Sequence, residues 1–157
     1  MMTPTIEGRV LQALGIQSDE HVLEIGTGSG FLTACLARLG ANVTSIEIHE
    51  DFLPIAAAAL DDCDIDNVEL LNMNAMQELP EGRFDAIAIT GSLQAFDPRF
   101  VEALKPDGRL FVVVGNAPVL KARLVLRTGQ KDWETISLFE TTLEPLINGA
   151  LPPQFLF

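Results

Sequence analysis

Residues 21–31 read HVLEIGTGSGF, a short strand-like run that ends in three glycines spaced by two. Glycine is expected where φ must be positive, or where a ligand approaches the main chain so closely that a Cβ atom would collide with it. Gly26, Gly28 and Gly30 fall within five residues, and turn geometry alone explains such a cluster poorly. This stretch therefore predicts a backbone shaped for a ligand at the end of a strand.

Strand and helix patterns alternate around this stretch. Strands are predicted at residues 21–25, 42–48, 67–71, 84–89 and 109–114. Helices are predicted near the N-terminus, where Thr3 is the N-cap and Gly15 the end, and at 29–39, 51–60 and 98–104. The strands are almost continuously apolar, which is typical of a parallel sheet covered on both faces. We expect a doubly wound α/β fold with a mostly parallel sheet, helices on both faces and a single domain, 1–157.

Within the predicted helices, several apolar positions are expected in the core or at helix packing contacts. They are Phe31, Cys35, Phe52 and the run Ala56–Ala59.

The end of the chain breaks the alternation. LKARLVLRT (120–128) and WETISLFE (133–140) flank the turn residues GQKD without a helix between them, which predicts a C-terminal antiparallel hairpin. Methyltransferase sheets of the Rossmann-like type have such a hairpin, and nucleotide dehydrogenase sheets lack it. Lys121, Arg123 and Arg127 share one side of the first strand of this hairpin, which we interpret as a solvated face, with an acceptor-binding role as the alternative. We expect the last stretch, 145–157, to pack across the sheet edge as irregular chain or a short helix.

Composition and charge exclude several functions. The net charge of −12, from 22 acidic and 10 basic residues, disfavours nucleic-acid partners, which usually meet a basic face. No apolar run approaches the roughly 20 residues of a membrane span, and no export signal is recognisable at the start. Cys35 and Cys63 form neither a CxxC motif nor a cluster with histidine. We therefore expect no metal site, no membrane and a cytoplasmic location.

Two classes of cofactor compete for a glycine-rich turn at the carboxyl end of such a sheet. The dinucleotide motif G-x-G-x-x-G requires glycine at position 31, where this chain has Phe31. Glu24, two residues before Gly26, is unsuited to a pyrophosphate but matches the α-ammonium and sulfonium of S-adenosylmethionine. Glu47 ends the next strand 19 residues after Gly28, a place from which a carboxylate can accept both ribose hydroxyls. The pattern favours S-adenosylmethionine as the cofactor.

At this point the chain resembles a known family, the protein-L-isoaspartate O-methyltransferases. Three stretches are similar in residues and order to that family's motifs: VLEIGTGSGFLTACLARLGANVTSIEI, FDAIAITGS and LKPDGRLFVVVG. The resemblance covers roughly residues 1–128. Family members carry an N-terminal segment before an I-S-Q-P stretch, and that segment helps to cover the active site. This chain begins almost at that stretch, so we expect part of the lid to be absent.

The resemblance implies roles for individual residues. It places the cofactor against the first motif and the end of the next strand, at Glu24, Gly26, Thr27, Gly28, Ser29, Gly30, Glu47 and Ile48. Asn74 and Ala75 stand where the family has an Asp-Gly pair that meets the adenine. Thr90 and Ser92 lie in the loop between cofactor and acceptor, and Thr3 aligns with the serine of the I-S-Q-P stretch beside the acceptor. Thr3 and Ser92 are the predicted catalytic residues.

The expected reaction is methyl transfer to the carboxylate of a damaged protein or peptide. Such an in-line displacement needs no general base, because a carboxylate is already ionised at neutral pH, so the enzyme mainly orients the reactants. Neither His21 nor His49 is then required as a catalyst. Two alternatives stay open: a methyltransferase of the same fold that acts on a small molecule or RNA, and a non-catalytic cofactor-binding domain.

Overall fold

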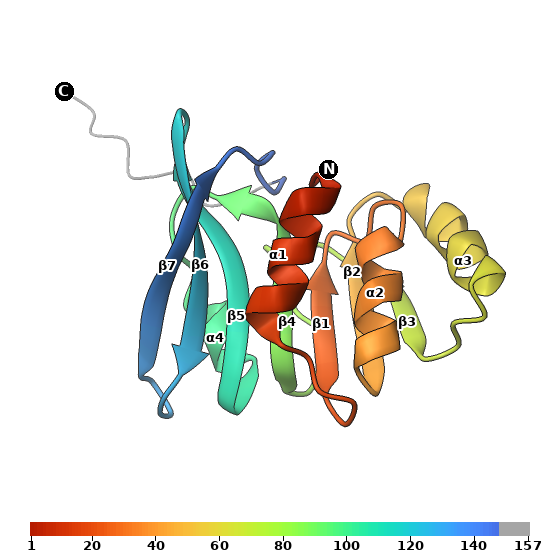
Figure 1. Ribbon diagram of the computed structural model, residues 1–157, viewed down its shortest axis with the longest axis horizontal. Helices are drawn as coiled ribbons and strands as arrows, with labels where there is room; N and C mark the ends of the chain where they lie inside the picture. The colour runs from red at the N-terminus through yellow and green to blue at the C-terminus, as the bar shows by residue number, and fades with distance from the viewer. Residues whose placement is uncertain (148–157) are drawn as a thin grey trace.

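The computed structural model of the chain describes residues 1–147. Across these residues seven strands form one sheet in the order β3-β2-β1-β4-β5-β6-β7 (Figure 1). The strands are β1 His21–Ile25, β2 Asn42–Glu47, β3 Val68–Asn72, β4 Phe84–Leu93, β5 Leu104–Asn116, β6 Val119–Arg127 and β7 Trp133–Thr141. The helices are α1 Pro4–Leu14, α2 Phe31–Leu39, α3 Phe52–Asp62 and α4 Arg99–Glu102. β1 to β5 pair in parallel and β6 and β7 antiparallel, which confirms the predicted fold class and the hairpin.

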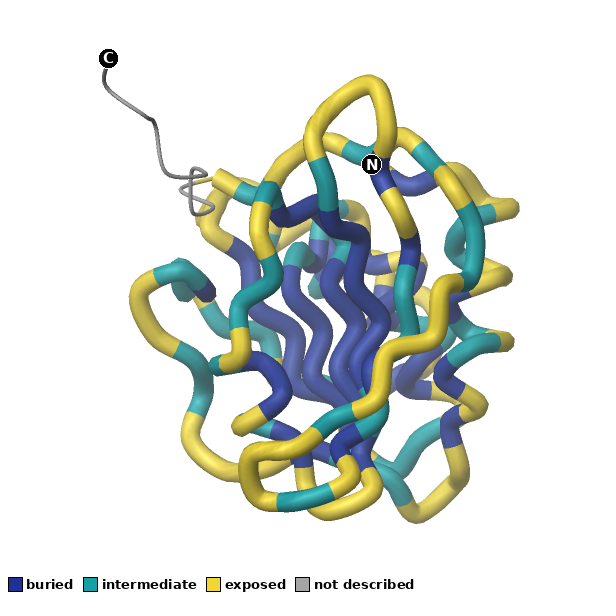
Figure 2. The backbone as a smooth tube through the Cα atoms, turned by 90° about the vertical axis from the view of Figure 1, so that its left-hand side faces the viewer, coloured by how far each residue is buried: buried dark blue, intermediate teal, exposed yellow. Residues whose placement is uncertain are grey.

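The two faces of the sheet are covered differently. α1, α2 and α3 lie on one face, whereas α4 and irregular chain lie on the other (Figure 1). One apolar cluster joins the sheet to the three long helices and includes Val10, Leu36 and Phe111, while a second cluster on the opposite face includes Leu23 and Phe100. Figure 2 shows the resulting central layer of buried strands. Each fully buried Leu or Phe side chain contributes roughly 1.5–3 kcal/mol to stability, so both faces hold the sheet in place.

Local signals explain where α1 begins and ends. The Thr3 hydroxyl accepts the backbone N–H of Ile6 at 3.4 Å, Pro4 occupies the first helical position, and Gly15 follows in the left-handed conformation with φ 54°. The fourth helix, α4, is shorter than the helix predicted at 98–104. Leu104 already pairs with Phe84 as the start of β5, and this pairing ends the helix.

The prediction that Phe31 and Phe52 are core residues is wrong, since they are 57% and 42% exposed. The start of α2 packs closely on α3, because a Cβ atom on Gly30 would lie 3.2 Å from the Cα atom of Ala56. This packing turns Leu32 and Leu36 toward the sheet, so Phe31 lies outside the core.

The interpretation of Arg127 as part of a solvated face is also wrong. Arg127 is buried, and its guanidinium donates hydrogen bonds to backbone carbonyls of Leu104 at 2.5 Å and Gln130 at 2.7 Å. It lies beside the end of α4, where carbonyl groups lack helical partners. On the same strand Lys121 is exposed, but Arg123 is half-buried and Val125 is fully buried, so this side of the strand is not the continuous solvated face that was predicted. A register shift between Ala122 and Arg123 interrupts the alternation.

Beyond β7 the chain turns back over the sheet. Ser92 and Pro145 form an isolated bridge, and residues 145–147 are irregular as predicted, but they pack at the carboxyl end of β4, the central strand, and not across an outer strand of the sheet. The remainder of that prediction, 148–157, lies outside the described residues. None of the helices within residues 1–147 is long and apolar enough to cross a membrane.

Candidate cofactor site

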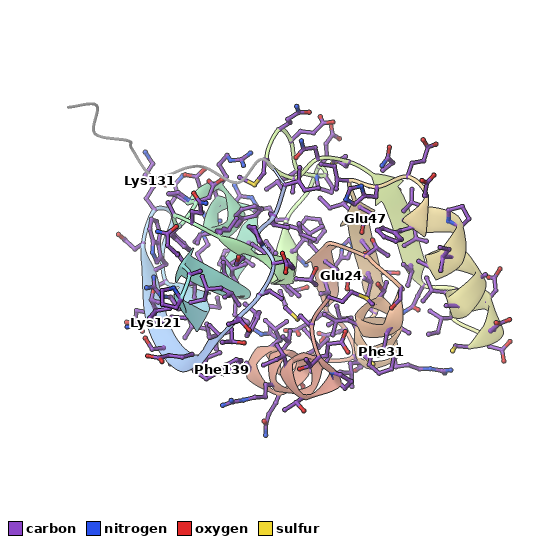
Figure 3. All side chains as sticks on the ribbon, turned by 90° about the horizontal axis from the view of Figure 1, so that it is seen from above. Glu24, Phe31, Glu47, Lys121, Lys131 and Phe139 are labelled. Carbon is purple, nitrogen blue, oxygen red and sulfur yellow. The ribbon has the colours of Figure 1, made fainter. Side chains whose placement is uncertain are left out.

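The candidate site lies where the carboxyl ends of β1, β2 and β4 meet. β1 pairs with both β2 and β4, so the glycine turn that follows β1 is flanked by the ends of its two neighbours. Figure 3 looks down on this edge and shows Glu24 and Glu47 close together on neighbouring strands. This is the edge at which doubly wound sheets bind ligands.

A cavity of about 300 Å³ occupies one side of the glycine turn. Five of the predicted cofactor residues line it, namely Gly26, Glu47, Ile48, Asn74 and Ala75. The other lining residues are Ile25, Ile46, His49, Met73, Met76 and Glu144 to Ile147. Walls that are mostly apolar, with a few polar groups, are typical of pockets for a small organic ligand.

A smaller crevice of about 40 Å³ lies on the other side of the turn. Its predicted members are Glu24, Gly26, Thr27, Gly28, Ser29 and Thr90, and Met1, Met2, Glu7, Phe31 and Leu32 complete it. Gly26 lines both cavities, so the two form adjoining parts of one site. Thr3, Gly30 and Ser92 line neither.

The three glycines of the turn all have positive φ, but they face different neighbours. A Cβ atom on Gly26 would collide with the hydroxyl oxygen of Thr90, and Gly30 is enclosed by Ala56. For Gly28 the nearest atom to such a Cβ is the sulfur of Met1, at an ordinary contact distance of 3.7 Å. Gly28 is therefore the one glycine of the turn whose missing side chain leaves room beside the crevice.

Thr90 joins the end of β4 to the glycine turn. Its hydroxyl lies 2.8 Å from the carbonyl oxygen of Ile25 and 2.9 Å from that of Gly26, and it donates its proton to one of them. This hydrogen bond ties the end of β4 to the junction between β1 and the glycine turn. The backbone N–H of Gly28 points instead to the carboxylate of Glu47.

Glu47 holds the turn from the other side. One carboxylate oxygen accepts the N–H of Gly28 at 2.9 Å and the other accepts the N–H of His49 at 3.0 Å. Glu47 is buried and takes part in none of the ion pairs found within residues 1–147. Since a carboxylate offers about four lone-pair positions, both oxygens keep acceptor capacity for a ligand.

Glu24 is fully buried in the centre of the site. One of its oxygens accepts hydrogen bonds from the hydroxyl of Ser45, at 2.6 Å, and from that of Thr33, while the other oxygen has no partner in the structure. Burial raises the pKa of Glu24 from 4.5 to about 7, although the hydrogen bonds from Ser45 and Thr33 lower it. A buried carboxyl oxygen without a partner is unfavourable, which marks this group as one that a ligand can satisfy.

Asn74 and Ala75 lie at the floor of the larger cavity. The side-chain oxygen of Asn74 accepts the N–H of Met76 at 3.0 Å, a local turn that Asn commonly forms. Ala75 is buried against the apolar cluster on the α4 side of the sheet. The Asn74 oxygen thus shapes the loop, and contact with an adenine stays a prediction.

The two predicted catalytic hydroxyls have partners within the protein. Thr3 is exposed and caps α1, next to Met2 of the crevice. Ser92 is buried, and its hydroxyl donates to the carbonyl of Leu143 at 3.0 Å. These contacts give Thr3 a capping role and Ser92 a tethering role, and catalysis by either one stays a prediction.

Sequence reasoning missed the segment Glu144–Ile147 as a wall of the larger cavity. Ser92 donates its N–H to the carbonyl of Glu144 at 2.8 Å and accepts the N–H of Leu146 at 2.9 Å. Gly91 makes room for this segment, because a Cβ atom there would lie 2.6 Å from the Leu146 side chain. Gly91 and the apolar run PLI at 145–147 could have indicated a packing contact. No pattern in the sequence pairs these two stretches, because they lie about fifty residues apart.

Comparison with solved structures shows which fold the chain has. A protein-L-isoaspartate O-methyltransferase from Plasmodium falciparum, crystallised with S-adenosyl-L-homocysteine, superposes with a TM-score of 0.78 at 20% identity, over 93% of this chain and 75% of that chain. A second solved protein-L-isoaspartate O-methyltransferase gives a TM-score of 0.82 at 22% identity, over 92% of this chain and 47% of that one. The fold is that of the Rossmann-like methyltransferases.

Sequence comparison then gives the family. The model of the family described as Protein-L-isoaspartate(D-aspartate) O-methyltransferase (PCMT) matches residues 1–146, and the chain belongs to this family. A protein-L-isoaspartate O-methyltransferase 1 of Nitrosospira multiformis is 38% identical over 130 residues, which are 82% of this chain and 55% of that protein. One of Opitutus terrae is 41% identical over 115 residues, 73% of this chain and 49% of that protein. The chain thus spans about half the length of these two curated relatives.

Proposed function

We propose that the chain binds S-adenosylmethionine along the carboxyl edge of its sheet and methylates the carboxylate of an isoaspartyl residue in a protein or peptide. One observation carries this proposal. Two cavities adjoin at Gly26, and each contains a buried carboxylate, Glu47 or Glu24, that no cation of the described chain neutralises. A ligand with two hydroxyls at one point and an ammonium at another would complement both.

The larger cavity suits the adenosyl part of such a ligand. Ile48 and Met73 supply apolar surface for a flat ring, and the free lone pairs of Glu47 are placed to accept hydrogen bonds from a ribose. The smaller crevice suits the methionyl part, with Glu24 opposite its ammonium and Gly28 beside its chain. A relative of this fold was solved with S-adenosyl-L-homocysteine, which supports the choice of ligand.

The bound cofactor supplies an electrophilic methyl group on a sulfonium. The task of the protein is then to hold an ionised carboxylate in line with that methyl group, and alignment of this kind can lower a barrier by about 7–11 kcal/mol in favourable cases. Ser29 and Phe31 are exposed at the rim of the crevice and Thr3 lies next to it, so we assign the acceptor to this side. Ser92 acts indirectly by keeping the Glu144–Ile147 wall in place.

The acidic surface supports a peptide or small-molecule acceptor in preference to RNA, since the net charge is −12. Cys35 and Cys63 are free thiols, which suits a reducing cytoplasm.

The decisive experiment compares two synthetic peptides that differ only by isoaspartyl or aspartyl at one position, with cofactor labelled in the methyl group. We expect label in the isoaspartyl peptide, as a base-labile ester, and none in the aspartyl peptide. Calorimetry with S-adenosyl-L-homocysteine runs in parallel, so that binding and transfer are measured separately. Binding without transfer to either peptide would remove the acceptor assignment, and absence of binding would remove the whole proposal.

A further inference from the structure

Glu24 is the most constrained charged group of the site. Its residue surface is fully buried, one carboxyl oxygen is held by Ser45 and Thr33, and the second oxygen has no hydrogen-bond partner. The Ser45 hydroxyl is itself 2.6 Å from the hydroxyl of Thr27 in the glycine turn. The hydrogen bonds from Ser45 and Thr33 therefore fix the orientation of the carboxyl group, and Glu24 is one of the residues that line the smaller crevice.

The charged groups that act on Glu24 are acidic. The negative charges of Glu47 on β2 and Glu7 on α1 both raise the pKa of Glu24. On α2, burial raises the pKa of the Cys35 thiol, and the charges of Glu7 and Glu24 raise it further. The positive amino group of Met1 acts on Glu7, and Glu24 belongs to none of the ion pairs within residues 1–147. With its pKa near 7, this carboxyl group holds a proton in a large fraction of molecules at neutral pH.

We propose that the free oxygen of Glu24 exchanges its proton for the α-ammonium of the cofactor, so that cofactor binding releases one proton from this site to solvent. This inference rests on the proposed function. In the empty site the carboxylic acid is neutral. In the loaded site the carboxylate faces the ammonium, the O–H bond has broken, and the proton has left to the solvent.

The exchange follows from the cost of burying charge. A carboxylate in a buried site without a counter-ion is strongly disfavoured, and protonation removes the charge. An ammonium at the free oxygen restores the charged form, because an opposite charge at contact distance outweighs the desolvation of the carboxylate. The crevice of about 40 Å³ lies between the glycine turn and Met1 and Met2 and adjoins the larger cavity at Gly26, so it can receive the ammonium end of the methionyl part while the remainder extends toward the larger cavity.

Calorimetry in two buffers with different heats of ionisation counts the protons released on binding. For S-adenosyl-L-homocysteine we expect release of close to one proton at about pH 6, falling toward zero by about pH 8, and about tenfold tighter binding at pH 8 than at pH 6. The matched ligand is 5′-methylthioadenosine, which has the same adenosyl part but no ammonium. It should bind with no proton release and little dependence on pH.

Variants of the chain sharpen the test. Glu24→Gln should abolish the proton release, and Glu50→Gln, a change at an exposed carboxyl that lines neither cavity, should retain it. Ser45→Ala removes a hydrogen bond that lowers the pKa of Glu24, so the midpoint of the release should move to higher pH.

The outcomes separate this inference from the proposed function. If S-adenosyl-L-homocysteine binds at pH 8 but releases no proton at pH 6, the exchange is refuted while cofactor binding stands. Equal release with 5′-methylthioadenosine would also refute it, because the titrating group would then lie on the adenosyl side. If neither ligand binds at any pH, both proposals fall. The comparison of the two ligands needs only the unmodified protein, so a Glu24 variant that does not fold cannot obscure the answer.

Discussion

The carboxylates at the amino ends of the strands, the amino edge of the sheet, differ from those at the carboxyl ends, the carboxyl edge, in whether they have a cationic partner. At the amino edge Glu20 pairs with Arg109 at 2.6 Å and Asp85 pairs with Lys105 at 3.1 Å. At the carboxyl edge Glu24 and Glu47 are more deeply buried and have no cation among residues 1–147. Strand β1 joins the two regions. It begins at His21, which follows Glu20 and donates its N–H to Asp85, and it carries Glu24 near its carboxyl end. Paired and unpaired carboxylates are therefore separated by a strand of only five residues.

The pKa values follow this difference. The hydrogen bond from Arg109 lowers the pKa of Glu20. Burial would raise the pKa of Asp85, but the backbone N–H of His21 and the ammonium of Lys105 lower it overall. Glu24 shifts the other way, because burial dominates and no cation offsets it. The carboxylates at the amino ends of the strands are thus paired within the protein, whereas those at the carboxyl ends have no cationic partner among residues 1–147.

The largest effect is expected from breaking the amino edge. Arg109→Ala removes the partner of Glu20 and hydrogen bonds to the carbonyls of Leu14 and Gly15 at the end of α1. We expect the free energy of unfolding to fall by roughly 3 kcal/mol, measured by urea denaturation. The affinity of the folded variant for S-adenosyl-L-homocysteine should not change, and a weaker affinity would show that the two edges are coupled.

The next effect concerns the pH dependence of stability through Glu24. Its pKa in the folded state is raised, so between pH 4.5 and 7 the unfolded chain gives up the proton while the folded chain retains it. Stability of the wild type therefore declines as pH rises through this window. Glu24→Gln does not titrate, and its free energy of unfolding relative to wild type should improve by roughly 2–3 kcal/mol between pH 5 and pH 8. Denaturation curves at the two pH values test this, and parallel behaviour of the two proteins would contradict it.

Removing the other buried carboxylate should weaken ligand binding. Glu47→Gln replaces an acceptor of two backbone N–H groups and of the proposed ribose contact by an amide that can accept through only one atom. We expect a loss of about 2 kcal/mol in the binding free energy of S-adenosyl-L-homocysteine, measured by calorimetry. Glu50→Gln is the matched control, since Glu50 is exposed and lines neither cavity.

The smallest effect is expected at the exposed pair of the amino edge. Lys105 is 46% exposed and Asp85 is 24% exposed in their side chains, and pairs of this kind contribute about 0–1 kcal/mol. Lys105→Met should change the free energy of unfolding by less than about 1 kcal/mol, and high salt should reduce the difference further. A loss as large as that of Arg109→Ala would show that Asp85 depends on Lys105 much more than its exposure indicates.

Much of the fold follows from signals within short stretches. Thr3, Pro4 and Gly15 set the limits of α1, and the apolar runs of β4 and β5 identify buried strands. The glycine turn and the acids at the ends of β1 and β2 locate the site, because the carboxyl ends of parallel strands meet at one edge. These features depend on neighbours in sequence, and they were predictable for that reason.

Other features depend on which segments meet in space. Phe31 is exposed because α2 packs on Ala56, Arg127 is buried because α4 ends beside it, and Leu146 lines the cavity because Ser92 and Gly91 receive its segment. No local pattern distinguishes these positions from a core phenylalanine, a surface arginine or a loop leucine.

The order of residues predicts the alternation of strands and helices, the glycine turn and the acids near the ends of β1 and β2. It does not predict that Glu24 has one oxygen held by Ser45 and Thr33 and one without a partner, which depends on how the chain packs. The difference arises because backbone conformation responds to adjacent residues, whereas burial, hydrogen-bond partners and pKa depend on groups that come from distant parts of the chain.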